Sequence, residues 1–377
     1  MSRFGRIRNV KSRRKYSDVF DALKEEIVGG KYRVGSVFPS HAMIARRFGI
    51  SNLTAVKVVE KLKDAGLVCS QQGRGTFVTR QGASRKIGIL VPDIGQSELF
   101  SKIVHEIVQC AQNAGYLTLF GDIASPDAEF RAQKAEALAR DFVAQGVAGV
   151  ILQPVEFTEN QEVVNRRILE TFDRAGIPVV FCDCDLMDSS VCSGYDVVGV
   201  NNFEVGGAMY DHVVACGARR ISFLLRPNSS RSHWNRCQGA LLRTMAKGRK
   251  PCAVLQADPD DVAAVRRHLR QQRPDAIICP NDKTAARLLH VLDKLGYAVP
   301  DDVLLVGCDD TSLSRLTTPA LTTVHLPCDQ IGAEAFRRLL ERIAHPDVPT
   351  QERFLSFKLI SRESTKRTIR NSTGGRT

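Results

Sequence analysis

The 377-residue sequence lacks several features that define common classes of protein. It contains no uninterrupted apolar run that approaches the ~20 residues of a membrane-spanning helix. Its first residues, MSRFGRIRNVKSRRKY, are basic and have no apolar core of the kind that a secretory signal needs. We therefore expect a cytoplasmic protein that makes no contact with a membrane.

Catalytic and metal-binding motifs are also missing. The sequence has no G-x-x-x-x-G-K-[ST], no H-E-x-x-H and no G-x-S-x-G. Its 11 cysteines include no C-x-x-C pair, and the cluster Cys182, Cys184 and Cys192 has no His or fourth Cys at ligand spacing. We expect reduced, mostly buried thiols, no metal, no cofactor and no enzymatic activity. An enzyme, or a ligand-binding protein without a role on DNA, are the alternatives.

Positive charge is concentrated at the N-terminal end of the chain. Residues 1–86 hold 19 Lys+Arg against 6 Asp+Glu, whereas the remaining residues hold 34 against 35. A basic module on a nearly neutral body is typical of a protein that binds a polyanion. Residues 1–15 form a basic arm, which is either a solvated tail or an arm that adds non-specific affinity for DNA.

Residues 16–80 have the pattern of three short helices followed by a hairpin. Helices are expected at 17–28, 41–48 and 52–64, and strands at 67–69 and 76–78. Ser40 and Ser51 suit the N-caps of the second and third helices, and Gly49 suits the turn between them. This is the plan of a winged helix-turn-helix, in which the third helix enters the major groove.

The same residues resemble the DNA-binding domain of GntR-type bacterial regulators. The matching strings are Gly30 to Gly35, Phe38-Pro39-Ser40, Gly49-Ile50-Ser51-Asn52-Leu53-Thr54 and Gly73-Arg74-Gly75-Thr76-Phe77-Val78. The resemblance implies that the partner is a double-stranded DNA operator. Three arginines that are habitual in that family are replaced here by Ala42, Asn52 and Val56, so the operator should differ from the family's usual sites.

The DNA contacts are expected on the outer face of the third helix, on the preceding helix and at the wing. Asn52 can bind adenine, and Leu53 or Val56 can meet a thymine methyl group. The full expected set is Ser40, Arg46, Arg47, Ser51, Asn52, Leu53, Thr54, Val56, Lys57 and Arg74. A winged helix that contacts protein instead of DNA is the alternative, but it does not explain the excess of positive charge in these residues.

From residue 87 to residue 363, short apolar runs alternate with segments of helical length. The runs lie at 86–94, 116–122, 147–155, 177–183, 197–202, 219–225, 252–258, 274–282 and 302–310. Such a pattern predicts an α/β fold with parallel sheets covered on both faces. Nine strands favour two lobes, which change over near 183–197 and 323–328 and enclose a cleft. Residues 81–86 are expected to be a linker and 364–377 a disordered tail.

Polar residues end several of these strands, where ligands of parallel sheets bind. Carboxylates and amides suit a hydroxyl-rich ligand, although each can instead cap a helix. The order of strings such as Val91-Pro92-Asp93, Asn281-Asp282 and Gly307-Cys308-Asp309-Asp310 resembles the LacI/GalR regulators and their sugar-binding periplasmic relatives. The expected effector contacts are Gln96, Phe100, Asp183, Trp234, Arg236, Asn281, Asp282 and Asp309.

The two resemblances together imply a regulator of transcription that forms a homodimer. Its operator affinity would be controlled by a sugar or sugar derivative bound between the lobes, and it would most simply repress genes of carbohydrate use. An activator of the same architecture, or a regulator that responds to a nucleobase, are the alternatives. The hinge helix that is usual in regulators of the LacI type is absent from residues 79–86, so the signal must pass to DNA in a different way.

Overall fold

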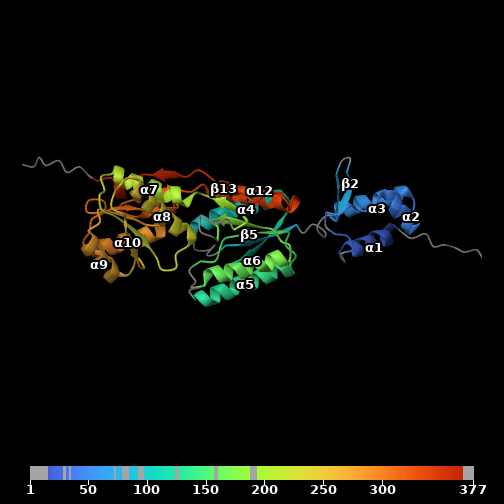
Figure 1. Ribbon diagram of the computed structural model, residues 1–377, viewed down its shortest axis with the longest axis horizontal. Coiled ribbons are helices and arrows are strands. Elements are labelled where there is room, and N and C mark those ends of the chain that lie inside the picture. Colours follow the sequence, from blue (N-terminus) through green and yellow to red (C-terminus); the bar gives the residue numbers. More distant parts are fainter. Residues whose placement is uncertain are drawn as a thin grey trace, which may run out of the picture. The chain divides into compact units, whose positions relative to one another are not determined.

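The computed structural model describes residues 16–28, 31–33, 35–71, 74–78, 85–91, 97–123, 127–156, 160–186 and 193–367. The chain divides into two compact units, residues 1–85 and 86–377. Figure 1 shows both units. No helix in the described ranges is both long enough and apolar enough to cross a bilayer.

The first unit is a winged helix-turn-helix. Its elements are α1 (Tyr16–Val28), α2 (His41–Phe48), α3 (Asn52–Asp64), β1 (Val68–Gln71) and β2 (Gly75–Val78). The expected helices and hairpin are confirmed, with element ends that differ by one or two residues. An isolated antiparallel bridge between Val37 and Phe77, which the sequence pattern did not indicate, joins the segment before α2 to the wing.

Local chemistry explains where the helices of this unit begin and end. Ser40 accepts a hydrogen bond from the Met43 amide, and Ser51 accepts one from the Thr54 amide, so each serine caps a helix. Gly49 ends α2 with a φ of 66°, a left-handed conformation that glycine adopts without a steric penalty. The apolar faces of the three helices meet in one core, as their 3.6-residue spacing predicts.

The second unit contains two parallel sheets and a small antiparallel pair. The six-stranded sheet, which defines the first lobe, has the order β13-β7-β6-β5-β3-β4, and the four-stranded sheet, which defines the second lobe, has the order β11-β10-β8-β9. The strands of these sheets are β3 (Lys86–Leu90), β4 (Leu117–Gly121), β5 (Gly149–Leu152), β6 (Val179–Asp183), β7 (Asp196–Gly199), β8 (Ile221–Leu225), β9 (Ala253–Gln256), β10 (Ala276–Ile278), β11 (Leu304–Val306) and β13 (Glu352–Phe354). The antiparallel pair is β12 (Thr323–His325) with β14 (Lys358–Ile360). The α/β class with two parallel sheets is confirmed, and nine of these strands overlap the nine predicted runs.

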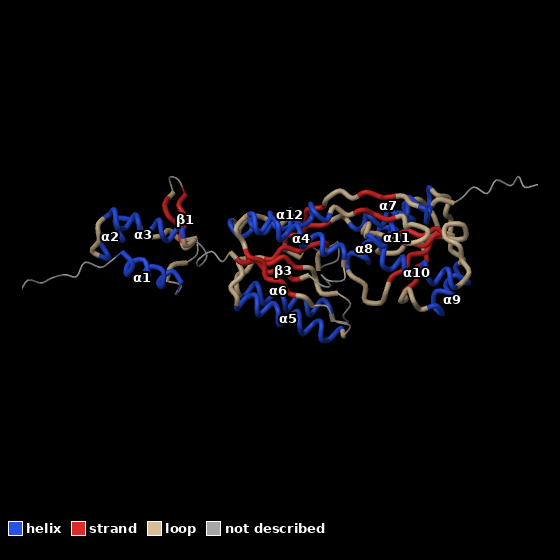
Figure 2. The backbone as a smooth tube through the Cα atoms, turned by 180° about the vertical axis from the view of Figure 1, so that it is seen from behind, coloured by secondary structure: helices blue, strands red, loops and turns tan. Residues whose placement is uncertain are grey.

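Helices cover both faces of each sheet. They are α4 (Glu98–Asn113), α5 (Ala128–Ala144), α6 (Gln161–Arg174), α7 (Asn202–Ala215), α8 (Arg231–Ala246), α9 (Val262–Gln272), α10 (Asp282–Lys294), α11 (Ser312–Leu316) and α12 (Cys328–Ala344). In the first lobe α4 and α12 lie on one face and α5 and α6 on the other; in the second, α7 and α8 lie opposite α9 and α10 (Figures 1 and 2). Alternate side chains of β5 and β8 therefore enter different core clusters, and the strands are apolar on both faces.

The chain passes between the lobes at positions that differ from the predicted ones. The first change was expected within 183–197, but β7 is hydrogen-bonded to β6 and belongs to the first lobe, so the change follows Gly199. The second, near 323–328, agrees with β12 lying in the second lobe and α12 packing on the first-lobe strands. A third passage, between β13 and β14, was missed because both strands are only three residues long and β13 is exposed at every position.

Two smaller boundary predictions are wrong. Lys86 belongs to β3 and not to the linker. The tail was expected to begin at 364, yet a 3-10 helix spans Glu363–Thr365 and buries Ser364 and Thr365. The reason is long-range pairing: the Ser364 hydroxyl donates to the Leu305 carbonyl at 2.6 Å, which ties this segment to β11. The basic arm 1–15 and residues 368–377 lie outside the described residues.

Candidate functional site

A cavity of about 170 Å³ lies where the carboxyl ends of the strands of both lobes approach one another. Since one water needs roughly 10–15 Å³, the space suits a small molecule and not a peptide or nucleic acid. Its walls are Ser97, Glu98, Leu99, Phe100, Arg131, Gln153, Glu156, Asp183, Arg226, Ser230, Ser232, His233, Arg236, Asn281, Lys283, Asp309 and Thr311. Both lobes therefore contribute to the walls.

Arg236 is the buried centre of this cavity, with only 1% of its surface exposed. Its Nε donates to Asn202 Oδ1 at 2.8 Å and its Nη1 donates to the Pro280 carbonyl at 2.6 Å. The same Nη1 lies 3.6 Å from Asp309 Oδ1. A guanidinium held this firmly cannot move to suit a ligand, so it acts as a fixed donor at the floor of the cleft.

Two carboxyl groups at strand ends face Arg236. Asp183 ends β6 with a φ of 77°, and Asp309 follows β11 with a φ of 104°. Non-glycine residues rarely adopt such angles, and strained residues of this kind cluster at binding sites. Burial raises the pKa of Asp183, while Arg236 and a hydrogen bond from Ser232 act in the opposite direction. Burial also raises the pKa of Asp309, to about 8, against the opposing effect of Arg236.

Unused hydrogen-bonding capacity points into the same space. Gln153 directly follows β5, is 1% exposed, and its Oε1 has no hydrogen-bond partner among the described residues. Asp309 Oδ1 also lacks a hydrogen bond within the described part of the chain. Buried polar atoms are normally paired, so these two oxygens indicate a place where hydroxyl or amine donors of a ligand bind.

The raised pKa of Asp309 makes the free energy of unfolding of the protein depend on pH. A carboxyl whose pKa rises on folding stabilises the fold while it is protonated, and this contribution is lost as the pH rises through about 8. Between pH 6 and 8 we expect the free energy of unfolding of the ligand-free protein to fall by roughly 2 kcal/mol relative to that of Asp309→Asn, whose neutral amide does not titrate. Urea unfolding of both proteins across this range measures the difference. Parallel stability profiles would show that Asp309 is ionised throughout.

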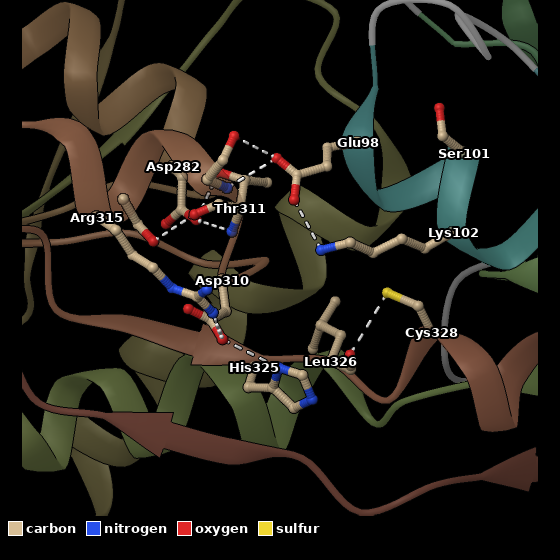
Figure 3. A network of polar contacts seen from close by, with 12 residues as sticks. Glu98, Ser101, Lys102, Asp282, Asp310, Thr311, Arg315, His325, Leu326 and Cys328 are labelled. Carbon is tan, nitrogen blue, oxygen red and sulfur yellow. Dashed lines mark hydrogen bonds and ion pairs between the residues drawn. The ribbon is translucent and has the colours of Figure 1, made fainter.

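A direct contact joins the lobes at the rim of the cavity. Glu98, in the first turn of α4, accepts hydrogen bonds from the Ser312 amide and hydroxyl at 2.7 Å each, and Lys102 donates to its other oxygen at 2.7 Å. Figure 3 shows Glu98 and Lys102 facing the segment that carries Thr311. These bonds hold the pKa of Glu98 at about 2 despite its partial burial. A second contact joins the lobes, since Arg231 of α8 donates to Glu162 of α6 at 3.3 Å.

Some expected effector residues line the cavity and others do not. Phe100, Asp183, Arg236, Asn281 and Asp309 all line it. Asn281 also caps α10, since its Oδ1 accepts from the Thr284 amide at 2.8 Å, so the helix-cap interpretation holds for that oxygen.

Two of the expected residues lie away from the cavity wall. Asp282 is fully buried, and its carboxylate accepts hydrogen bonds from Thr323 at 2.6 Å and from the amide and hydroxyl of Thr311 (Figure 3). It therefore fastens α10 to two neighbouring segments. Trp234 packs against the apolar core and is absent from the lining. Gln96 lies outside the described residues.

Sequence reasoning missed several residues of the wall. Gln153 and Arg226 each directly follow a strand, so the strand-end rule would have found them had it not been restricted to Asp and Asn. His233, three residues before Arg236, lines the cavity in place of its neighbour Trp234. Arg131 lies in the amphipathic helix α5, and nothing in its local sequence marks it as a wall residue.

The exposed surface of the first unit carries most of the expected DNA contacts. Asn52, Leu53 and Lys57 project from α3 into solvent, with Leu53 71% exposed, while Thr54 and Val56 are partly covered. Arg46 and Arg74 are exposed as well. Ser40 and Ser51 use their hydroxyl oxygens as helix caps, which leaves their hydroxyl protons for other acceptors.

Arg47 differs from this set because it is held within its own unit. It forms a two-pronged ion pair with Glu26 and also donates to the Tyr32 hydroxyl at 3.1 Å. The guanidinium lowers the pKa of Glu26 to about 2. Arg47 therefore links α2 to α1, whereas the sequence indicated only an outward-facing arginine that contacts DNA.

Comparison with known proteins assigns both units. Residues 15–78 match the model described as "Bacterial regulatory proteins, gntR family", and residues 210–365 match the model of a "Periplasmic binding protein-like domain". The first unit is therefore a GntR-type DNA-binding domain, and the second unit contains a periplasmic-binding-protein-like domain.

Known regulators of transcription are similar to this chain over most of its length. The chain is 25% identical over 369 residues to the arabinose metabolism transcriptional repressor of Geobacillus stearothermophilus, and the match covers 93% of this chain and 98% of the relative. It is 27% identical to the transcriptional repressor PurR of Haemophilus influenzae, with 88% and 96% covered. The relatives are regulators of transcription and not enzymes.

The fold is shared with a solved ligand complex. The transcriptional regulator CelR in complex with cellobiose superposes with a TM-score of 0.64 at 22% identity, and the match covers 87% of this chain and 100% of that chain. At this identity the likeness concerns the fold, which is the two-lobed architecture described above.

Proposed function

We propose that this regulator is a dimeric repressor whose affinity for operator DNA is set by a small hydroxyl-rich ligand in the cleft. The observation that carries the proposal is the buried Arg236, faced by Asp183 and Asp309 inside a cavity built from both lobes. Fixed donors beside carboxyl acceptors suit hydroxyl groups, each of which donates and accepts a hydrogen bond. The names of similar proteins support a sugar, since they include an arabinose repressor and complexes with cellobiose and D-xylulofuranose.

Control of DNA binding follows from ligand-dependent movement of the lobes. A ligand that contacts both walls favours their closed arrangement, and a dimer converts that closure into a new spacing of its two DNA-binding units. By linkage, any effect of ligand on operator affinity has an equal effect of operator on ligand affinity. Titration of ligand with and without operator DNA measures this reciprocity.

Exposed apolar side chains at the sheet edges of the second unit support the dimer. Leu117 and Phe120 lie on the edge strand β4, where they are 67% and 46% exposed, and Val254 lies on the edge strand β9. Leu242 and Met245 project from α8 with 57% and 66% exposure. Large apolar side chains that are exposed on edge strands and helices are common at interaction surfaces. Sedimentation equilibrium of the full chain tests this assembly.

A regulator that responds to a nucleobase is the second candidate. The observation in its favour is the similarity to PurR repressors at 27% identity. The lining of the cavity favours a hydroxyl-rich ligand instead, because Phe100 is its only aromatic ring among the described residues other than the imidazole of His233. A flat heterocycle would be expected to bind between aromatic faces.

The DNA-binding role is tested by the salt dependence of operator affinity. The full chain should prefer fragments of its own promoter over random DNA, and its affinity should fall steeply as salt rises. Arg74→Ala should weaken binding to all sequences and lower the salt slope by about 1, because one phosphate contact is lost. Arg174→Ala, which removes the same charge from an arginine that is 80% exposed on α6, is the matched control. An unchanged slope for Arg74→Ala would remove the wing from the DNA interface.

A further inference from the structure

Helix α3 differs in its chemistry from the basic segment that contains it. It has no arginine, although residues 1–86 hold 19 Lys+Arg against 6 Asp+Glu. In helix-turn-helix proteins the N-terminal residues of this helix contact the edges of the bases. Arginine is the commonest reader of guanine, because its planar donors bind two guanine acceptors at once. The helix that enters the major groove in such proteins therefore lacks, in this chain, the usual side chain for G·C pairs.

Two of the three lysines of α3 are held within the first unit. The ammonium group of Lys61 lies 4.6 Å from the centre of the Phe20 ring of α1. Lys63, in the last turn of the helix, forms an ion pair with Glu60 at 2.8 Å. Lys57, the remaining lysine, is exposed. The half of α3 that begins the helix therefore presents one cation to DNA.

The first turn of α3 presents one amide and one apolar side chain. The hydroxyl groups of Ser51 and Thr54 share a hydrogen bond at 2.8 Å, and Ser51 also caps the helix. Asn52 and Leu53 lie between them and are both exposed, Leu53 by 71%. Single exposed leucines are common on protein surfaces, so this exposure by itself indicates no function. The position of Leu53 beside Asn52, in the turn that meets base edges, is what indicates one.

The chemistry of the bases matches these two side chains to A·T pairs. An asparagine amide donates to N7 of adenine and accepts from its N6 amino group. Leucine has no hydrogen-bonding group, and the apolar group that it can contact in the major groove is the 5-methyl group of thymine. Val56, the other residue that the sequence indicated for such a contact, is partly covered. Leu53 is therefore better placed than Val56 to reach a base.

We propose that α3 recognises an operator half-site through A·T pairs, with Leu53 against the methyl group of a thymine and Asn52 hydrogen-bonded to an adenine. The inference rests on the proposed function of the chain as a repressor that binds operator DNA. It assigns sequence discrimination to an apolar contact and a neutral amide. Affinity comes instead from the cations of the basic segment, which bind phosphates of any sequence. Discrimination should then persist at salt concentrations that weaken all binding.

Removal of single methyl groups from the operator tests the contact. The full chain first selects its operator from random DNA, and each thymine of one half-site is then replaced in turn by deoxyuridine. This replacement removes the 5-methyl group and keeps every hydrogen-bonding group. At one thymine the affinity should fall about 4-fold, the value of one buried methyl group. Selected half-sites made of G·C pairs alone would overturn the inference, as would an operator in which no replacement changes the affinity.

A double-mutant cycle identifies the side chain that contacts the methyl group. Leu53→Ala should weaken binding to the thymine operator by about 4- to 10-fold and remove its sensitivity to deoxyuridine, so the two changes together cost little more than the protein change alone. Because Leu53 lies outside the apolar core of its unit, the variant should remain folded. Its salt slope should be unchanged, since no charge is lost. Effects that simply multiply would exclude Leu53 from the contact.

Two matched variants complete the test. Lys57→Ala, one turn further along α3, should weaken binding to every sequence and lower the salt slope by about 1, while the ratio of thymine to deoxyuridine affinities stays the same. Val163→Ala truncates a 49% exposed apolar side chain on α6 of the second unit and should change neither quantity. A chain that selects no sequence from random DNA would defeat the proposed function itself, which distinguishes that failure from failure of this inference.

Discussion

Replacing Gly206 by alanine is expected to destabilise the effector domain by about 3 kcal/mol, one of the largest effects of a single methyl group in this protein. A Cβ at this position would lie 1.8 Å from the carbonyl oxygen of Arg236 and 2.6 Å from its carbonyl carbon. Both atoms belong to the backbone of α8, so relief requires the two helices to separate. Gly239 makes the reciprocal approach, with a Cβ position 2.0 Å from the Phe203 oxygen.

The neighbouring glycine provides a matched control. A Cβ at Gly207 would meet the guanidinium of Arg243 at 3.1 Å, and that side chain is 45% exposed and can move aside. Gly207→Ala should therefore be neutral or slightly stabilising, since alanine favours a helix over glycine by about 1 kcal/mol. Urea unfolding of both variants gives the comparison. Equal stabilities would contradict the close approach of α7 and α8.

The same substitution should impair the ligand site. Gly206 touches the backbone of the residue whose guanidinium forms the floor of the cleft, so separation of the helices displaces Arg236 from Asn202 and Asp309. Loss of ligand affinity in Gly206→Ala, at a temperature where the variant is folded, would show that close helix packing positions the site. Near-normal affinity would confine the effect of this glycine to stability.

Arg236→Met is expected to abolish ligand binding, with a loss of more than about 100-fold, and to cost roughly 3–5 kcal/mol of stability. The variant removes the hydrogen bonds to Asn202 and to the Pro280 carbonyl. It also leaves Asp183 and Asp309 buried without their shared cation. Both carboxyl groups should then bind protons more tightly still, because the guanidinium that lowers the pKa of each is removed.

Two further variants separate charge from geometry at this position. Arg236→Lys keeps the charge but loses the planar set of donors, so it should recover stability better than ligand affinity. Arg243→Met, seven residues along the same helix, removes a surface arginine and should cost no more than about 1 kcal/mol. Calorimetry with the sugar or sugar derivative that the unaltered protein binds most tightly measures the affinity of each variant. Unchanged affinity in Arg236→Met would exclude this guanidinium from the binding site.

The sequence predicted those features whose causes are local. The serine caps, the left-handed Gly49 and the helical spacing of apolar residues act within a few positions, and α2 and α3 appear where they indicate. Apolar runs identified the strands of the two main sheets for the same reason. The exceptions, β12, β13 and β14, are three residues long and owe their conformation to pairing partners far along the chain.

The candidate site was predictable where strand ends carried its chemistry, as at Asp183 and Asp309. It was not predictable where a role depends on a distant partner. Asp282 resembles a strand-end ligand in sequence, but Thr323, 41 residues later, occupies its carboxylate. Arg47 resembles an exposed basic residue, but Glu26 of α1 binds it.

By itself, the sequence determined that this protein has a basic winged helix joined to a two-lobed α/β domain, because caps, glycines, apolar periodicity and charge are written in short stretches of chain. Only the tertiary structure decided which polar side chains line the cleft and which form hydrogen bonds or ion pairs that stabilise the fold around it. Glu98 and Ser312 are 214 residues apart and meet across the rim. Such partnerships arise from strand order and helix packing, which no local pattern contains.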